Sequence, residues 1–194
     1  RWKNGNIMIR RHIDTYISGF YKNSNKALLI TGARQTGKTF SIREFGKQWD
    51  CFVEINFIEN EQADLLLKNA KGTDDLLLRL SAITSKKLEK GKTLIFFDEV
   101  QACPEIVTAV KFLVDEGSYR YILSGSLLGV ELKDLRSEPV GYMGIKEMFP
   151  LDLEEFVRAV GINDKVVEHL RRAWENREAV DGFIHTKMME LFRL

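Results

Sequence analysis

The chain has 194 residues, enough for one domain of ordinary size with a buried core. Its 29 Lys and Arg nearly balance its 28 Asp and Glu, so the net charge of +1 does not point to nucleic acid or to an anionic membrane. No apolar run is as long as a membrane span, and the N-terminus lacks the pattern of a signal peptide. We therefore expect a cytoplasmic protein without a membrane partner. Because the chain begins with Arg1 rather than methionine, we also expect it to be a piece of a longer protein.

The cysteines and histidines show no metal-binding or disulfide pattern. Cys51 and Cys103 are far apart and form no C-x-x-C pair, and His12, His169 and His185 each stand alone. The sequence therefore predicts two free thiols and no zinc site.

The N-terminal part of the chain predicts a helix, a buried strand and a second helix. Apolar residues recur at helical spacing between residues 9 and 21. Residues 27–30 (ALLI) form a continuous apolar run, as in strands that are buried on both faces. Residues 40–46 are compatible with a helix, so residues 31–39 lie between a strand and a helix.

Residues 31–39 (TGARQTGKT) fit the phosphate-loop pattern G-x-x-x-x-G-K-[ST]. Its glycines let the loop curl, so that backbone N–H groups converge on phosphate oxygens at a helix N-terminus. Lys38 would neutralise charge on the β- and γ-phosphates, and Thr39 would offer its hydroxyl to Mg²⁺. The alternative, a glycine-containing turn with a surface lysine, does not account for the strand-loop-helix context. The expected nucleotide-binding residues are Gly32, Ala33, Arg34, Gln35, Thr36, Gly37, Lys38, Thr39 and Phe40.

The next elements are a strand and two helices. Residues 51–57 are rich in aromatic and β-branched residues and predict the second strand. Helices are expected over residues 61–69 and 73–90, the longer one with acidic residues near its start and lysines near its end. Gly91 is expected to close the longer helix.

The third strand, residues 93–99, is an apolar run that ends in Asp98 and Glu99. A buried strand has no structural use for an acidic pair, but ligands bind at the carboxyl ends of strands in open α/β sheets. We expect Asp98 to hold Mg²⁺, through its water, and Glu99 to be the base that orients an attacking water. The alternative for each residue is a helix cap or a surface carboxylate.

A helix from Pro104 to about Glu116 leads to the fourth strand, residues 119–124. Ser124 at its tip would touch the γ-phosphate or the attacking water, or it belongs to a plain turn that ends the strand. Gln101 would sense the nucleotide or face solvent. Arg34 and Arg136 are candidates to stabilise transition-state charge, although surface ion pairing is the more common role of such arginines.

The C-terminal part has poor periodicity over residues 127–150, with a short fifth strand expected over 143–149, and then predicts helices over 153–160, 164–175 and 180–194. Strands that alternate with helices favour an α/β fold with a parallel sheet covered on both sides. We expect residues 1–150 to form the nucleotide-binding core, and residues 151–194 to form a helical lid or the start of a second domain.

Four segments together resemble the prokaryotic AAA-like P-loop ATPases, in which an N-terminal ATPase domain precedes a C-terminal domain of poorly known character, with a nuclease-like role as one reading. They are the phosphate loop, FFDEVQ at 96–101, SGSLLG at 124–129 and FPLDLEEF at 149–156. The resemblance implies a three-layer fold with a five-stranded parallel sheet, in which the phosphate-loop strand lies beside the strand ending in Ser124. It also implies ATP and Mg²⁺ as cofactors. Lys38 and Thr39 match the family's Walker A pair, Asp98 and Glu99 its Walker B pair, and Ser124 its sensor.

The chain departs from this family in two places. Gly141-Tyr142 stands where many relatives carry Gly-Arg, so no arginine finger is assigned there, and the chain stops at Leu194 where relatives continue. We expect a slow ATPase domain that couples its nucleotide state to an attached domain or partner. The partner could be a nucleic acid or a protein that binds through the C-terminal region. A homo-oligomer is also open. The alternatives are a non-enzymatic nucleotide-dependent interaction module and a small-molecule kinase. The adjacent acids speak against the kinase, which must keep a water-activating base away from the γ-phosphate.

Overall fold

The computed structural model describes residues 9–60, 62–63, 70–126 and 141–191. These residues belong to two compact units, one formed by His12–Pro150 and the other by Arg1–Arg11 together with Leu151–Leu194. Apart from residues 62–63, the expected helix over 61–69 lies outside the described residues, as does most of the irregular stretch over 127–150, including Arg136.

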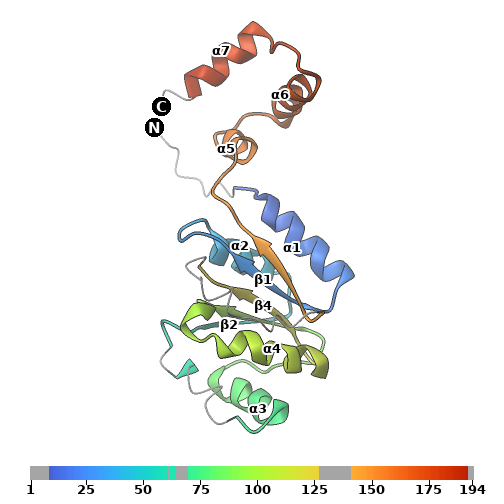
Figure 1. Ribbon diagram of the computed structural model, residues 1–194, viewed down its shortest axis with the longest axis vertical. Coiled ribbons are helices and arrows are strands. Elements are labelled where there is room, and N and C mark those ends of the chain that lie inside the picture. Colours follow the sequence, from blue (N-terminus) through green and yellow to red (C-terminus); the bar gives the residue numbers. More distant parts are fainter. Residues whose placement is uncertain (1–8, 61, 64–69, 127–140, 192–194) are drawn as a thin grey trace. The chain divides into compact units, whose positions relative to one another are not determined.

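The larger unit contains a five-stranded parallel sheet in the order β2-β3-β4-β1-β5 (Figure 1). This arrangement confirms the predicted fold class, including the position of the phosphate-loop strand β1 beside β4. The strands are β1 (Ala27–Thr31), β2 (Cys51–Asn56), β3 (Thr93–Asp98), β4 (Arg120–Ser124) and β5 (Met143–Glu147).

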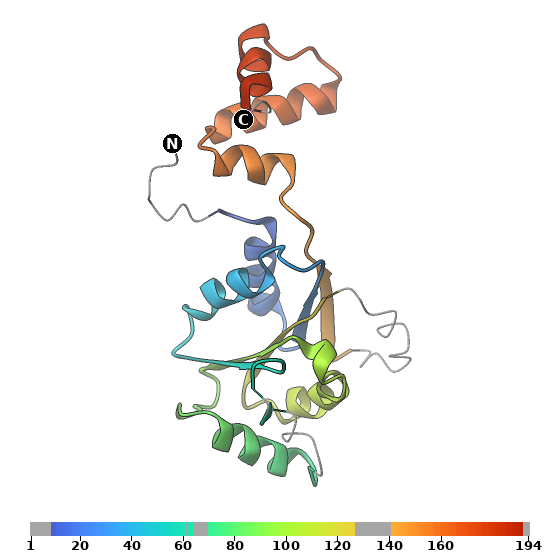
Figure 2. The same ribbon diagram turned by 90° about the vertical axis from the view of Figure 1, so that its left-hand side faces the viewer.

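Every residue of β1 and β3 is buried, because both faces of the sheet are covered by helices. Side chains alternate between the faces, so Leu28 and Phe96 belong to one apolar cluster while Leu29 and Phe97 belong to the other. Helices α1 and α2 cover the first face and α3 and α4 cover the second (Figure 1 and Figure 2). The continuous apolar runs in the sequence thus become the middle layer of three.

The helices of this unit are α1 (His12–Asn23), α2 (Lys38–Gly46), α3 (Thr73–Ile83), α4 (Glu105–Glu116) and the short 3₁₀ helix η2 (Val100–Ala102). The expectation that α3 continues to Lys90 is wrong. Thr84 is already extended, and its hydroxyl accepts a hydrogen bond from the N–H of Lys86 at 3.2 Å. This local side-chain contact competes with the helical hydrogen bond and ends the helix, and Leu88 then packs against the core.

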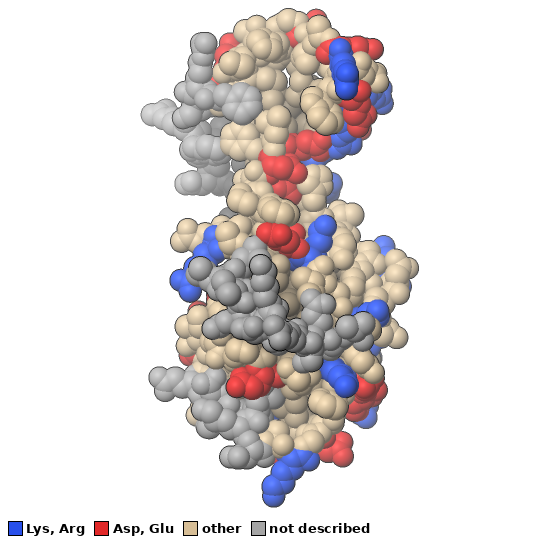
Figure 3. Space-filling model, viewed as in Figure 1, with Lys and Arg blue, Asp and Glu red and all other residues tan. Residues whose placement is uncertain are grey.

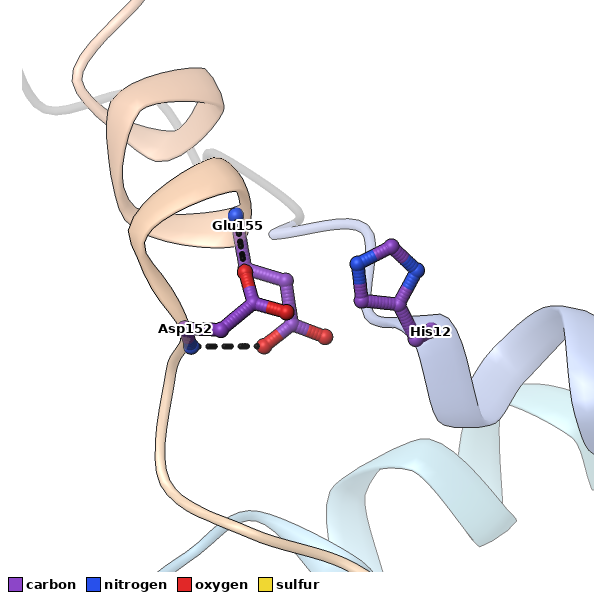
Figure 4. A group of neighbouring side chains, drawn as sticks. All are labelled: His12, Asp152 and Glu155. Carbon is purple, nitrogen blue, oxygen red and sulfur yellow. Dashed lines mark hydrogen bonds between the residues drawn. The ribbon is translucent and has the colours of Figure 1, made fainter. Parts of the chain in front are cut away.

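The smaller unit consists of α5 (Leu153–Ala159), α6 (Asp164–Asn176) and α7 (Gly182–Leu191) around an apolar cluster of Val157, Val167 and Met188. Helix α5 begins with a capping box, drawn with dashed lines in Figure 4. The N–H of Glu155 donates to Asp152 at 2.8 Å, and the N–H of Asp152 donates to Glu155 at 3.2 Å. Glu155 also forms a buried ion pair with Arg11 at 3.0 Å.

The surface seen in Figure 3 carries Lys and Arg interspersed with Asp and Glu, as the nearly balanced composition predicts. Within the described residues, no helix is both long and apolar enough to span a membrane. Cys51 and Cys103 are free thiols, as the sequence predicts.

Candidate functional site

The phosphate loop leaves the carboxyl end of β1 with a backbone that requires glycine. Gly32 has φ +142°, and a Cβ placed there would lie 2.2 Å from the carbonyl oxygen of Met148. Gly37 has φ 97° at the N-cap of α2, and Gln35 also has a positive φ of 64°. These residues curl the loop so that it ends at a helix N-terminus, the arrangement in which backbone N–H groups converge on a bound phosphate.

Side chains of the loop fold back onto it. Thr36 donates from its hydroxyl to the carbonyl of Ala33 at 3.0 Å. Lys38 donates from Nζ to the carbonyls of Gly32 at 2.9 Å and Ala33 at 2.7 Å. Burial lowers the pKa of Lys38, while the nearby negative charges of Glu99 and Asp98 oppose this change. The ammonium group is therefore held over the loop with its charge supported by the acidic pair.

Asp98 joins the loop to the ends of β3 and β4. Its side chain accepts hydrogen bonds from the Thr39 hydroxyl at 3.1 Å, from the Glu99 N–H at 3.0 Å, and from the Ser124 hydroxyl. Asp98 is only 3% exposed, and this burial raises the pKa of its carboxyl group, against the lowering effect of the two hydroxyl donors. A carboxylate beside a hydroxyl is the hard oxygen donor set that suits Mg²⁺, so Thr39 and Asp98 fit the predicted metal site.

Glu99 has a strained backbone, with φ 57° and ψ 44° in the left-handed region. Such conformations are uncommon for residues other than glycine and cluster at functional sites. The side chain accepts a hydrogen bond from the amide nitrogen of Gln101. The backbone therefore leaves the direction of β3 at Glu99, and Gln101 holds the Glu99 side chain.

A cavity of about 510 Å³ brings the loop and Glu99 together. It is lined by Arg34, Gln35, Gly37, Lys38, Thr39, Phe40, Ile58, Glu99 and Ser126. Most of these are predicted site residues, but Ile58 and Ser126 are not. Ile58 has no reactive group and belongs to no motif, so the sequence does not mark it as a site residue. Ser126 belongs to the polar sequence Ser-Gly-Ser with which the fourth strand ends, and this polar ending is the signal that could have identified it.

Ser124, for which contact with the γ-phosphate or the attacking water is predicted, ends β4. It is 1% exposed, its hydroxyl is bonded to Asp98, and it is not among the residues that line the cavity. Gln101 does not face solvent freely, because its side-chain oxygen accepts from the N–H of Ser126 at 3.2 Å. Arg34 is an exposed residue on the cavity wall.

A parallel sheet of this order, with a phosphate loop between β1 and α2 and an acidic pair after β3, defines the class of P-loop ATPases. Residues 24–157 match the model of a family described as AAA domain. The chain therefore belongs to this family of AAA domains.

Two solved structures match the chain. The Walker-type ATPase PABY2304 of Pyrococcus abyssi is 15% identical, with a TM-score of 0.51 over 90% of this chain and 60% of that one. PCH-2 of C. elegans is 13% identical, with a TM-score of 0.44 over 88% of this chain and 48% of that one. The chain thus spans at most 60% of the length of these two proteins. No curated protein matches the sequence.

Proposed function

We propose that this domain binds Mg-ATP in the phosphate-loop cavity, hydrolyses it to ADP and phosphate, and passes its nucleotide state to an attached domain or partner. One observation carries the proposal. Lys38, Thr39 and Glu99 line one cavity, and the Thr39 hydroxyl lies 3.1 Å from the carboxylate of Asp98. The residues proposed as phosphate-binding cation, Mg²⁺ ligands and base therefore lie close together, which supports the proposal.

Binding rests on the loop and on Lys38. The loop backbone cradles the phosphates, and Lys38 can move from the carbonyls of Gly32 and Ala33 to phosphate oxygens, which are stronger acceptors because they are charged. Bound Mg²⁺ would supply positive charge that offsets the negative charge of the phosphates. Thr39 and Asp98 are the residues that would hold it.

Hydrolysis rests on Glu99. A water oxygen forms a bond to the γ-phosphorus while the bond from the bridging oxygen to that phosphorus breaks, and ADP leaves with the bond electrons. Glu99, on the cavity wall, accepts the proton that the water loses. Charge that develops on the phosphoryl group is stabilised by Lys38, and Arg34 is the arginine on the same wall that is available to help.

The test is Glu99→Gln, in which the amide can still hydrogen-bond a water but cannot take its proton. We expect phosphate release to fall by about 10²- to 10⁴-fold, while Mg-ATP binding measured by calorimetry stays intact. Glu105→Gln is the matched control, since Glu105 is exposed at the start of α4 and does not line the cavity. Parental hydrolysis by Glu99→Gln would move the base elsewhere, and a phosphorylated metabolite in place of free phosphate would favour the kinase alternative.

Coupling to a further domain or partner is the second part of the proposal. It is supported by the P. abyssi ATPase of similar fold, of which this chain spans only 60%. An arginine supplied from a neighbouring chain or domain typically adds roughly 10³–10⁵ in rate to phosphoryl transfer. We therefore expect slow hydrolysis by residues 1–194 that accelerates when the longer protein or its assembly is tested at rising concentration. Equal, concentration-independent rates would show that the domain is catalytically complete.

A further inference from the structure

The hydroxyl of Ser126 is the feature that the proposed mechanism leaves without a role. Ser126 is 6% exposed and lines the phosphate-loop cavity, yet its Oγ has no hydrogen-bond partner among the described residues. Buried polar atoms are nearly always paired, so the unpaired hydroxyl of a residue that lines this cavity points to a ligand group as its partner. The Ser124 hydroxyl is already bonded to Asp98, so Ser126 is the serine of this segment that is free to meet a phosphate.

Gln101 connects Ser126 to Glu99. Its side-chain oxygen accepts from the Ser126 N–H at 3.2 Å, and its side-chain nitrogen donates to the Glu99 carboxylate. The orientation of the amide is fixed, since the oxygen end must face the N–H donor and the nitrogen end must face the carboxylate. Gly125 allows this close approach, because a Cβ there would lie only 3.2 Å from the Gln101 oxygen.

We propose that Gln101 is a positioning residue that joins Ser126 to Glu99, so that a γ-phosphate bound by the Ser126 hydroxyl sets the direction of the Glu99 carboxylate. This inference rests on the proposed ATPase function. A γ-phosphate oxygen that accepts from Ser126 fixes the Ser126 backbone, and its N–H then fixes Gln101. ADP is shorter by one phosphoryl group, so it leaves the Ser126 hydroxyl without this partner and the chain of hydrogen bonds is less constrained.

Two substitutions of similar size remove one or both of the side-chain contacts of Gln101. Gln101→Glu can still accept from the Ser126 N–H but cannot donate to Glu99, whereas Gln101→Met loses both contacts. We expect each to lower kcat for phosphate release by about 10- to 100-fold, as small misplacements of a catalytic group do, with the KM and the Kd for Mg-ATP little changed. Gln48→Met is the matched control, because Gln48 is exposed and lies outside the site.

A double-mutant cycle distinguishes positioning from a structural role. In a Glu99→Gln background the base is already absent, so Gln101→Glu and Gln101→Met should cause no further loss of kcat. A purely structural role of Gln101 would instead lower kcat by the same factor in both backgrounds. Thermal unfolding of each variant reports separately on folding.

Ser126→Ala tests the proposed contact between the Ser126 hydroxyl and the γ-phosphate. We expect the Kd for Mg-ATP, measured in the Glu99→Gln background to prevent turnover, to rise about tenfold, the effect of losing one hydrogen bond to a charged group. The Kd for Mg-ADP should not change. Equal losses for both nucleotides, no loss for either, or parental kcat in Gln101→Glu and Gln101→Met would each overturn the inference. Failure of the ATPase proposal itself would appear differently, as an absence of phosphate release by the parental protein.

Discussion

Gly32→Ala is the sharpest test of whether the phosphate loop depends on its backbone geometry. A Cβ at Gly32 would lie 2.2 Å from the carbonyl oxygen of Met148, a distance that Cβ contacts do not reach, so the loop must move until the separation is at least 3.0 Å. Met148 cannot simply retreat, because its N–H donates to the carbonyl of Thr31 at 2.8 Å in the pairing between β1 and the end of β5. The displacement of about 0.8 Å therefore falls on the loop.

The magnitude follows from the short range of hydrogen bonds. An N–H···O contact is made at 2.7–3.2 Å, so a shift of this size breaks or bends the contacts of the loop with phosphate. Losing one or two charge-assisted hydrogen bonds at roughly 1.5–3 kcal/mol each lowers nucleotide affinity by about 10- to 10⁴-fold. The positive φ of 142° adds backbone strain that alanine does not tolerate well.

Calorimetric titration with Mg-ADP and with a non-hydrolysable ATP analogue measures the loss, and thermal unfolding shows how far the fold itself is affected. Gly19→Ala is the matched control. Gly19 lies in α1, and a Cβ there would have no heavy atom within 4 Å, so this variant should bind normally and be more stable by roughly 0.5–1 kcal/mol. A Gly32→Ala protein that is fully folded and binds within about threefold of the parent would refute the reasoning.

Two further substitutions test the charged groups of the site. Lys38→Ala should abolish measurable Mg-ATP binding in calorimetry, because the phosphates lose the cation that the loop holds over them; unchanged affinity would contradict the role of the loop. Asp98→Asn should remove the Mg²⁺ dependence of nucleotide binding and, in the nucleotide-free protein, raise the melting temperature at neutral pH. The sign follows from the raised pKa of Asp98, because a carboxyl group whose pKa is higher in the folded state favours folding when protonated, and this contribution is lost as pH rises through the folded pKa. The difference in melting temperature between Asp98→Asn and the parent should therefore shrink below about pH 4, where the parental carboxyl is protonated in both the folded and the unfolded state. A difference that does not change with pH, or a variant that is less stable at neutral pH, would show that burial of the charge does not set the stability at this position.

The sequence alone determined the class of fold and the parts of the site that local patterns encode. Apolar runs at 27–30 and 93–97 are typical of strands covered on both faces, and their alternation with helical segments favours a parallel sheet between helices. The glycines at 32 and 37 and the acidic pair at 98–99 were recognisable because loop curvature and buried charge demand particular residue types at fixed spacing. Residues that the resemblance assigned by motif, such as Lys38 and Glu99, lie on one cavity wall, and their catalytic roles stay predictions.

Only the tertiary structure decided how the polar side chains beyond the strands are partnered. The Ser124 hydroxyl is directed to Asp98 because β3 and β4 are neighbours in the sheet, and this leaves Ser126 on the cavity wall. Gln101 meets both Glu99 and the backbone of Ser126 because Glu99 adopts a left-handed conformation that turns the chain after β3. Neither relation has a sequence signal, since a side chain that follows a strand takes its direction from the backbone dihedrals and from the neighbouring strand rather than from its own residue type.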